Sequence, residues 1–207
     1  MASGVVEAGG ESAPSEVALF PLNAVLFPDG PLPLRIFEPR YIDMVRRCMR
    51  EGSPFGVVLI LDGAEAGAPV ERMASVGTSA RITDFYPLPD GLLGIFCMGG
   101  RRFQIVRRWR QDDGLHVAEV RWLAEESRVP LPPEHQHLGA LMQRVLPELG
   151  ELYESVETRA DDAGWVACRL AEILPVGLTD KQRWLEIDDP LQRLGELAPL
   201  IRRDQPD

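Results

Sequence analysis

The sequence has almost no lysine: Lys181 is its only one, and arginine supplies the rest of its 22 basic residues. Its 32 acidic residues outnumber the basic ones and give a formal net charge of −10. A field of that sign repels phosphate backbones and anionic lipid head groups. Nucleic acids and membrane surfaces are therefore disfavoured as partners.

Long apolar runs are also absent. None approaches the roughly 20 residues that a membrane-spanning helix needs, and the first residues lack the basic and apolar regions of a secretory signal. Cys48, Cys97 and Cys168 are odd in number and lie within apolar runs, which indicates buried free thiols. We therefore expect a cytoplasmic protein whose segment 1–15, rich in Gly, Ser, Ala and Glu, is disordered.

The sequence lacks the usual signatures of catalysis. It contains no Gly-x-x-x-x-Gly-Lys-Ser/Thr phosphate loop, no Gly-x-Ser-x-Gly turn and no cysteine with an activating histidine nearby. His135 and His137 lie two residues apart at a predicted helix start, so they point in different directions and lack further ligands. Gly99 and Gly100 fit a turn between strands better than a phosphate-binding loop. The sequence predicts no catalytic residue, no metal and no cofactor.

Short apolar segments with β-branched and aromatic residues occupy the first 127 residues, separated by Pro and Gly. Six strands at this spacing suggest a barrel or a sandwich. Turn residues at 87–91 and 110–114 predict that the last three strands form an antiparallel meander. The predicted strands are 17–27, 55–62, 74–87, 92–98, 101–109 and 115–123.

One helix interrupts the strands. Tyr41, Val45, Cys48 and Met49 recur at helical spacing and are expected to face inward. Glu38 is placed at the N-cap, with a proline at the first helical position. A proline-rich stretch at 128–134 then marks the boundary between a β unit, 16–127, and a helical bundle, 128–207.

The bundle is expected to contain four helices. The first is bent at Pro147, the second starts near Asp162, the third starts at a capping box formed by Thr179 and Gln182, and the fourth starts at Asp189. Their apolar positions recur at helical spacing and predict the buried stripes. These positions are Leu138, Leu141, Val145, Leu149 and Leu152; Trp165, Cys168, Ala171 and Ile173; and Leu191, Leu194, Leu197 and Ile201.

Four blocks carry a family resemblance. LFPLNAVLFPDGPLPLRIFEPRYIDMV at 19–45 reads as a Pro-Leu strand, a Phe-Pro turn, an extended run and a helix behind Glu-Pro-Arg-Tyr. Three further blocks come in the same order as in the family. They are Val-Gly-Thr at 76–78 with ARITDFYPLPDG after it, MGGRRFQIV at 98–106, and LPVGLTDKQRWLEIDDPLQRLGEL at 174–197. The sequence resembles the N-terminal, substrate-binding domain of Lon proteases, as a stand-alone bacterial member.

The resemblance implies an α+β fold, with a PUA-like β pseudo-barrel carrying one amphipathic helix, followed by a small helical bundle. It also implies a non-catalytic module or adaptor that recognises polypeptides, without ATPase or peptidase parts. The expected partners are unfolded or specific client polypeptides and a cytosolic protease.

The candidate binding residues lie in or next to the matched blocks: Arg35, Glu38, Arg40, Tyr41, Arg102 and Phe103. Phe103 is expected in the core, and Arg102 is expected to pair with a carboxylate, which Glu38 could supply. Arg40 is expected at the surface. For Arg35, Arg40 and Tyr41, a role in the fold and a role in binding both stay open.

Two other functions remain open. Relatives of the PUA-like fold include RNA-modification modules, and the arginines between Arg101 and Arg110 could contact RNA, although alternation along a strand divides them between two faces. A small molecule could instead bind in a cleft between the two units.

Overall fold

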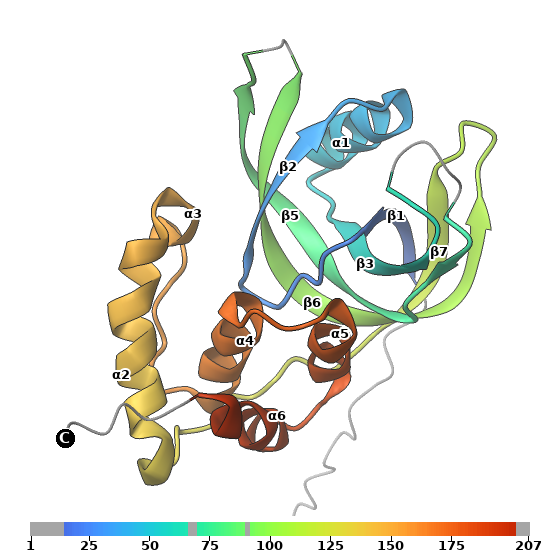
Figure 1. Ribbon diagram of the computed structural model, residues 1–207. Helices are drawn as coiled ribbons and strands as arrows, with labels where there is room; N and C mark the ends of the chain where they lie inside the picture. Colours follow the sequence, from blue (N-terminus) through green and yellow to red (C-terminus); the bar gives the residue numbers. More distant parts are fainter. Residues whose placement is uncertain (1–14, 66–69, 90–91, 202–207) are drawn as a thin grey trace, which may run out of the picture.

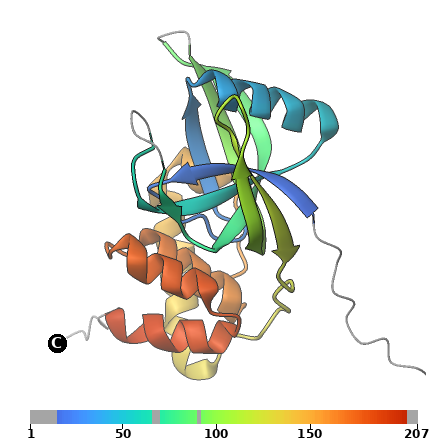
Figure 2. The ribbon, with the colours of Figure 1, turned by 90° about the vertical axis from the view of Figure 1, so that its right-hand side faces the viewer.

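The computed structural model describes residues 15–65, 70–89 and 92–201. It shows a strongly curved sheet with α1 near one end and a group of helices at the other (Figures 1 and 2). The predicted disordered segment, except Ser15, lies outside the described residues, as do the last two residues of the predicted turn at 87–91.

The described part of the sheet contains seven strands. They are β1 (Ser15–Leu22), β2 (Pro31–Ile36), β3 (Phe55–Asp62), β4 (Arg72–Met73), β5 (Val76–Pro87), β6 (Leu93–Arg110) and β7 (His116–Trp122). Their hydrogen-bonded order is β1-β7-β6-β5-β3-β4, and β2 pairs with β6. β1 also pairs with β3 in parallel, so that β1, β7, β6, β5 and β3 form a closed circuit of pairings. The predicted antiparallel meander corresponds to β5, β6 and β7.

The two strands predicted at 92–98 and 101–109 form one strand, β6, of 18 residues. The turn predicted at Gly99 and Gly100 is wrong, because both residues continue the strand and neither has a positive φ. The glycines instead allow close packing: a Cβ on Gly99 would lie 2.1 Å from the carbonyl oxygen of Phe27, and one on Gly100 would lie 2.6 Å from Ser79 Oγ. β6 can therefore pair with β2 along its first part and with β7 along its last part.

Two further differences concern the start of the chain. The first strand ends at Leu22 and not at residue 27, and β2 was missing from the predicted strands. Pro31 and Pro33 hide β2 in the sequence, since proline cannot donate to a strand ladder and is accepted at a sheet edge. β2 is such an edge, because β6 is its only strand partner in the described structure.

Helix α1 (Pro39–Glu51) packs on the sheet as predicted, with one change in its buried face. Tyr41, Met44, Val45 and Cys48 are buried, which is the i, i+3, i+4, i+7 pattern of a helix with one apolar face. Met49 lies off that face and is 47% exposed, so its predicted burial is wrong.

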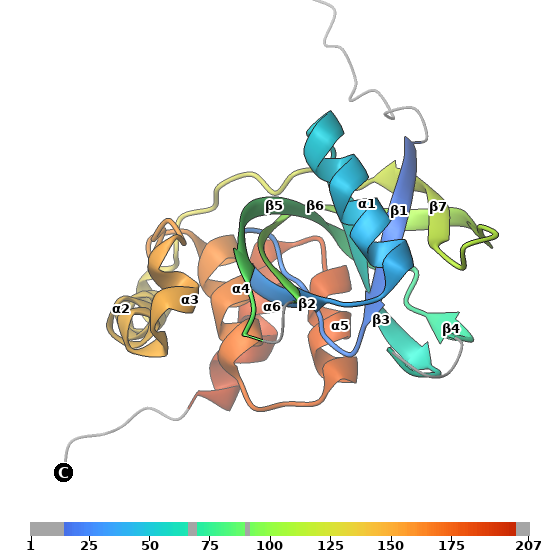
Figure 3. The same cartoon turned by 90° about the horizontal axis from the view of Figure 1, so that it is seen from above.

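The group of helices at the other end of the sheet is arranged around α4. Its members are α2 (Gln136–Val145), α3 (Glu151–Glu154), α4 (Ala163–Ile173), α5 (Leu178–Glu186) and α6 (Pro190–Leu197), with 3-10 turns at Pro133–His135, Leu146–Leu149 and Ala198–Leu200. Every residue of α4 from Ala163 to Ala171 is buried. From above, α2 and α3 lie farther from the strands than α4 does (Figure 3). None of the helices in the described part of the chain combines the length and apolar character needed to span a bilayer.

The predicted helix break at Pro147 is confirmed: α2 ends at Val145, and a 3-10 turn follows. Leu149, predicted to be buried, is 40% exposed because the changed helix direction moves it off the inner face. The side chain of Asp162 caps α4 by accepting a hydrogen bond from the backbone N–H of Gly164 at 3.1 Å.

Of the predicted starts of the last two helices, one is wrong and the other is confirmed. The capping box at Thr179 is wrong, since α5 begins at Leu178 with Gly177 at its N-cap. Asp189 does cap α6, although Leu191, expected in the buried stripe, is 44% exposed. A residue at the first turn of a short helix lies beside the cap and need not face the core.

Buried apolar residues form three clusters: one around α4, one between α1 and the sheet, and one that includes Leu19, Val58 and Phe103. The three cysteines are free and buried, as the sequence indicated.

Gly99→Ala should lower the free energy of unfolding by about 1–3 kcal/mol or more, because the new methyl group would overlap a backbone oxygen, which cannot move aside as a side chain can. Gly195→Ala is the matched control. It lies exposed in α6 with no atom near the added Cβ, and should stabilise the protein by about 0.5–1 kcal/mol. Urea unfolding measures both; equal effects would contradict the packing of β6 against Phe27.

Candidate functional site

The six candidate binding residues do not form one site. Glu38, Arg40 and Tyr41 lie together at the start of α1, Arg102 and Phe103 lie in the middle of β6, and Arg35 lies on β2. Of the six, only Arg35 is an exposed residue.

Arg40 connects α1 to the turn between β6 and β7. Its guanidinium donates to the carbonyl oxygen of Gly114 at 3.0 Å, pairs with Glu38 at 2.7 Å and lies 4.7 Å above the ring of Tyr41. That ring stacks on Phe20 with a centroid distance of 4.0 Å. Arg40 was expected at the surface, but its side chain is only 18% exposed. Glu38 occupies the N-cap position without a side-chain cap, because its carboxylate holds Arg40.

Arg102 leaves β6 and enters the helical group. It is 4% exposed and donates to the carbonyl oxygens of Leu185 at 2.7 Å and Ile187 at 3.1 Å. Its carboxylate partners are Asp188 at 3.0 Å and Glu126 at 3.4 Å, so the carboxylate that the sequence left open is not Glu38. Phe103, the next residue, points into the core and is fully buried.

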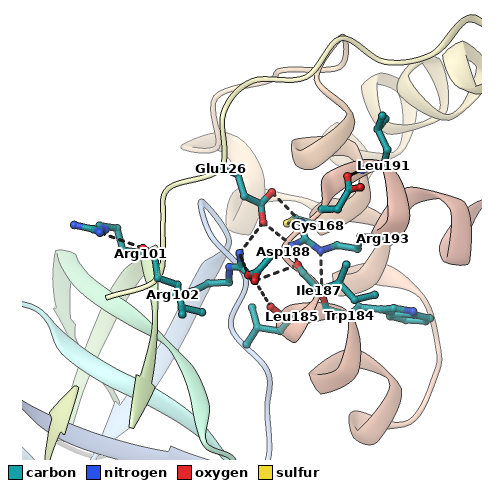
Figure 4. Close-up of polar contacts among 12 residues, drawn as sticks. Arg101, Arg102, Glu126, Cys168, Trp184, Leu185, Ile187, Asp188, Leu191 and Arg193 are labelled. Atoms are coloured by element: carbon teal, nitrogen blue, oxygen red, sulfur yellow. Dashed lines mark hydrogen bonds and ion pairs between the residues drawn. The ribbon is translucent and has the colours of Figure 1, made fainter. Parts of the chain in front are cut away.

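Glu126 joins Arg102 to a second buried arginine, Arg193 of α6 (Figure 4). Arg193 is 1% exposed and donates to the carbonyl oxygen of Trp184 at 2.9 Å and to Glu126 Oε2 at 3.0 Å. Sequence reasoning missed both residues: Arg193 is a polar residue within an amphipathic helix, which ordinarily faces water, and Glu126 lies in the connection after β7 without a motif that marks it. One carboxylate therefore links the sheet to α6.

A third buried arginine, Arg169 of α4, holds the loop before β2. It donates to the carbonyl oxygens of Pro28 and Asp29, both at 2.7 Å, and pairs with Glu172. Burial raises the pKa of Glu172 to about 7, and the neighbouring guanidinium only partly offsets this effect. Tyr153 of α3 donates its hydroxyl to the same carboxylate at 3.2 Å.

A cavity of about 360 Å³ opens between the middle of β6 and α4, beside this network. Its walls are residues 28–29, 100–102 and 124–127, with Arg159, Asp162, Gly164, Trp165 and Cys168. Burial raises the pKa of the Cys168 thiol to about 11, so this sulfur stays protonated and is a poor nucleophile.

Of the two histidines singled out in the sequence, His135 ends the 3-10 turn before α2 and His137 lies in the first turn of α2. The ring centroids of His135 and His137 lie 6.4 Å apart, and the described residues include no cluster of three His, Cys, Asp or Glu side chains able to hold a metal ion.

Each of the five arginines considered for RNA contacts another part of the chain. Arg101 binds Glu125, Arg102 is buried, and Arg107 lies over the ring of Trp109. Arg108 and Arg110 donate to the carbonyl oxygens of Glu71 and Gly114.

Three residues with exposed aromatic side chains lie where β2 ends and β5 approaches its turn. Phe37, Phe85 and Tyr86 are 52%, 58% and 40% exposed, and we call them the aromatic edge. The register brings their backbones close: Ile36, the neighbour of Phe37, and Pro87, the neighbour of Tyr86, both pair with Leu93 of β6. Phe85 and Tyr86 are consecutive in β5, so their side chains point to opposite faces of the sheet. Arg35 pairs with Gly94, which on its other side pairs with Tyr86, so Arg35 borders the same edge.

Comparison with known proteins shows the family to which the chain belongs. Residues 16–203 match the ATP-dependent protease La (LON) substrate-binding domain. The chain belongs to this family. A solved Lon N-terminal domain protein from Xanthomonas campestris shares 39% identity and a TM-score of 0.75, over 91% of this chain and 99% of that one.

The N-terminal domain of Mycobacterium avium complex Lon protease has the same fold, with a TM-score of 0.63 at 18% identity, over 89% of this chain and 97% of that one. Lon protease of Cytophaga hutchinsonii is 27% identical over 94% of this chain and 25% of its own length. That of Treponema pallidum is 27% identical over 94% of this chain and 23% of its own length. The chain thus spans about a quarter of the length of these relatives. The resemblance to the Lon substrate-binding domain is confirmed.

Glu126→Ala should lower the free energy of unfolding by about 3 kcal/mol, because it removes a carboxylate shared by Arg102 and Arg193, which are both buried. The adjacent Glu125→Ala is the control, since its side chain is 74% exposed and should change stability by less than about 0.5 kcal/mol. Thermal and urea unfolding report both. Similar losses in the two variants would contradict the linking role of Glu126.

Arg40→Ala should cost about 1–2 kcal/mol, because it removes a charged hydrogen bond to the β6–β7 turn as well as the contact with Tyr41. Arg46→Ala, on the same helix with a side chain 72% exposed, should cost less than about 0.5 kcal/mol. A stable Arg40→Ala protein would restore the surface role expected from the sequence.

Proposed function

We propose that this Lon-type domain recognises polypeptides destined for degradation and that the aromatic edge contacts them. The observation that carries the proposal is that three residues with exposed aromatic side chains lie at one end of the sheet, within a family defined by substrate binding. Single exposed apolar residues are common on protein surfaces, but grouped aromatic residues are typical of protein-binding sites.

Side-chain contact is the binding mode that the aromatic edge supports best. Strand addition needs free backbone donors, and both nearby strands limit them. Pro31 and Pro33 lack N–H groups on β2, while on β5 the register shifts between Ile82 and Asp84 and the N–H of Phe85 donates to the Asp84 side chain at 2.8 Å. Apolar contact with aromatic rings also tolerates varied client sequences.

The proposal includes finer points. The closed circuit of strand pairings would be the PUA-like pseudo-barrel, with units 16–127 and 128–207 as its β and helical parts. The domain would act without catalysis as a recognition module or adaptor in the cytosol, with unfolded or specific clients and a protease as partners. Arg35, at the border of the aromatic edge, is the candidate binding residue that fits this role; Arg40, Tyr41, Arg102 and Phe103 fit roles in the fold.

A binding experiment tests the aromatic edge. We expect the double variant Phe37→Ser, Phe85→Ser to bind reduced, carboxymethylated α-lactalbumin at least tenfold more weakly than the unmodified chain does, because aromatic residues at binding centres typically contribute more than 1 kcal/mol each. Fluorescence anisotropy of the labelled client gives the dissociation constants.

The control is the double variant Leu61→Ser, Val106→Ser, which removes two apolar side chains that are 48% and 60% exposed elsewhere. Its affinity should stay within about twofold of the unmodified chain. Equal losses in both variants, or no client binding by the unmodified chain, would count against the proposal.

A further inference from the structure

Two residues in the wall of the cavity beside α4 carry buried hydrogen-bond donors that the described residues leave unused. The indole Nε1 of Trp165 and the Nε of Arg159 are buried, and neither has a partner within the described structure. Both residues line the cavity. An arginine has four further N–H donors, whereas an indole has only one, so Trp165 is the stronger indication of a missing acceptor. Buried donors without an acceptor destabilise a protein and are uncommon.

The charges around the cavity restrict the kind of acceptor. Four carboxylates and three guanidinium groups line it. Each guanidinium is already paired: Arg101 with Glu125, Arg102 with Glu126, and Arg159 with Asp29. The lining therefore has one carboxylate more than it has guanidinium groups. That carboxylate would repel an anionic ligand, and no unpaired guanidinium in the lining would attract one. A neutral acceptor, with donors of its own for the carboxylates, fits better.

A peptide group has both properties, since its carbonyl oxygen accepts and its N–H donates. The volume, about 360 Å³, lies near the lower end of the range for small-ligand sites and suits a short segment. We infer that this cavity binds the main chain of an extended client segment, with carbonyl oxygens accepting from Trp165 and Arg159. The inference rests on the proposed function and adds a second contact, to the backbone, beyond the aromatic edge.

The surplus carboxylate also predicts which segments bind best. A segment with lysine or arginine gains from the one carboxylate in excess, whereas one with aspartate or glutamate is repelled. Because Trp165 Nε1 is buried, a ligand has to displace part of the wall to reach it, and the affinity of a short peptide should be weak.

Nuclear magnetic resonance of the four tryptophan indoles tests the site directly. The probe is acetyl-Ala-Lys-Gly-Lys-Ala-amide, which has no aromatic residue and no free terminus. Its addition should shift the indole N–H signal of Trp165, assigned through Trp165→Phe, and leave that of Trp109 in place. The matching peptide with glutamate in place of lysine should bind at least fivefold more weakly.

Variants test the two donors. Trp165→Phe keeps a ring in the wall but removes the N–H, and should weaken peptide binding about fivefold, the effect of losing one hydrogen bond. Arg159→Met should have a similar effect. Arg128→Met is the matched control: Arg128 binds Asp161 much as Arg159 binds Asp29, but lies outside the cavity wall, and its loss should leave binding unchanged.

The outcomes separate this inference from the proposed function. If the unmodified chain binds carboxymethylated α-lactalbumin and the aromatic-edge variant does not, the proposed function holds. An unmoved Trp165 signal at saturating peptide, or equal binding of the acidic and basic peptides, would then overturn the cavity alone. If the unmodified chain fails to bind the unfolded client, the proposed function fails, whatever the Trp165 signal does.

Discussion

Three buried arginines hold the sheet and the helices of this chain in one arrangement. Arg102, Arg169 and Arg193 are each 4% exposed or less, and each binds main-chain carbonyl oxygens as well as a carboxylate. Burying a guanidinium is unfavourable unless its donors are paired, so the carbonyl oxygens of 28–29 and 184–187 must stay where these side chains require them. The walls of the cavity come from β6, the loop before β2 and α4, which these contacts join.

Arginine suits this task where lysine would not. Its planar fork reaches several acceptors at fixed angles, while an ammonium group acts as a point charge on a flexible stem. Arg193 binds Trp184 and Glu126 with different nitrogens of one guanidinium, and Arg169 binds Pro28 and Asp29 in the same way. The near absence of lysine from the sequence is therefore compatible with a structural use of arginine.

The sequence predicted the elements better than their connections. Apolar periodicity located α1 and α4, and aspartate followed by proline located α6, because these signals are local. The continuity of β6 was missed because the need for Gly99 and Gly100 comes from Phe27 and Ser79, which are far away in the chain. The burial of Arg169 and Arg193 was missed because a charged residue within a predicted helix ordinarily faces water. At the candidate site, Arg40 and Arg102 were chosen from the family blocks, and the structure shows that both make contacts within the fold. Phe37 and Phe85 lie in the same blocks but were not chosen, because only the structure reveals their exposure.

Strand β6 runs from one proposed binding surface, the aromatic edge, to the other, the cavity. Gly94 borders the aromatic edge and Gly100 lines the cavity, so six steps along one strand, about 20 Å, separate them. Packing of Gly99 against Phe27 and of Arg102 among the helices makes this part of the strand rigid. A client that reaches both surfaces has to supply about six or more residues in extended form, with an apolar side chain at one end and accessible peptide groups at the other. Folded proteins seldom expose such a segment, since their apolar side chains are buried and their peptide groups are paired. On the proposed arrangement, preference for unfolded chains follows from the length of one strand.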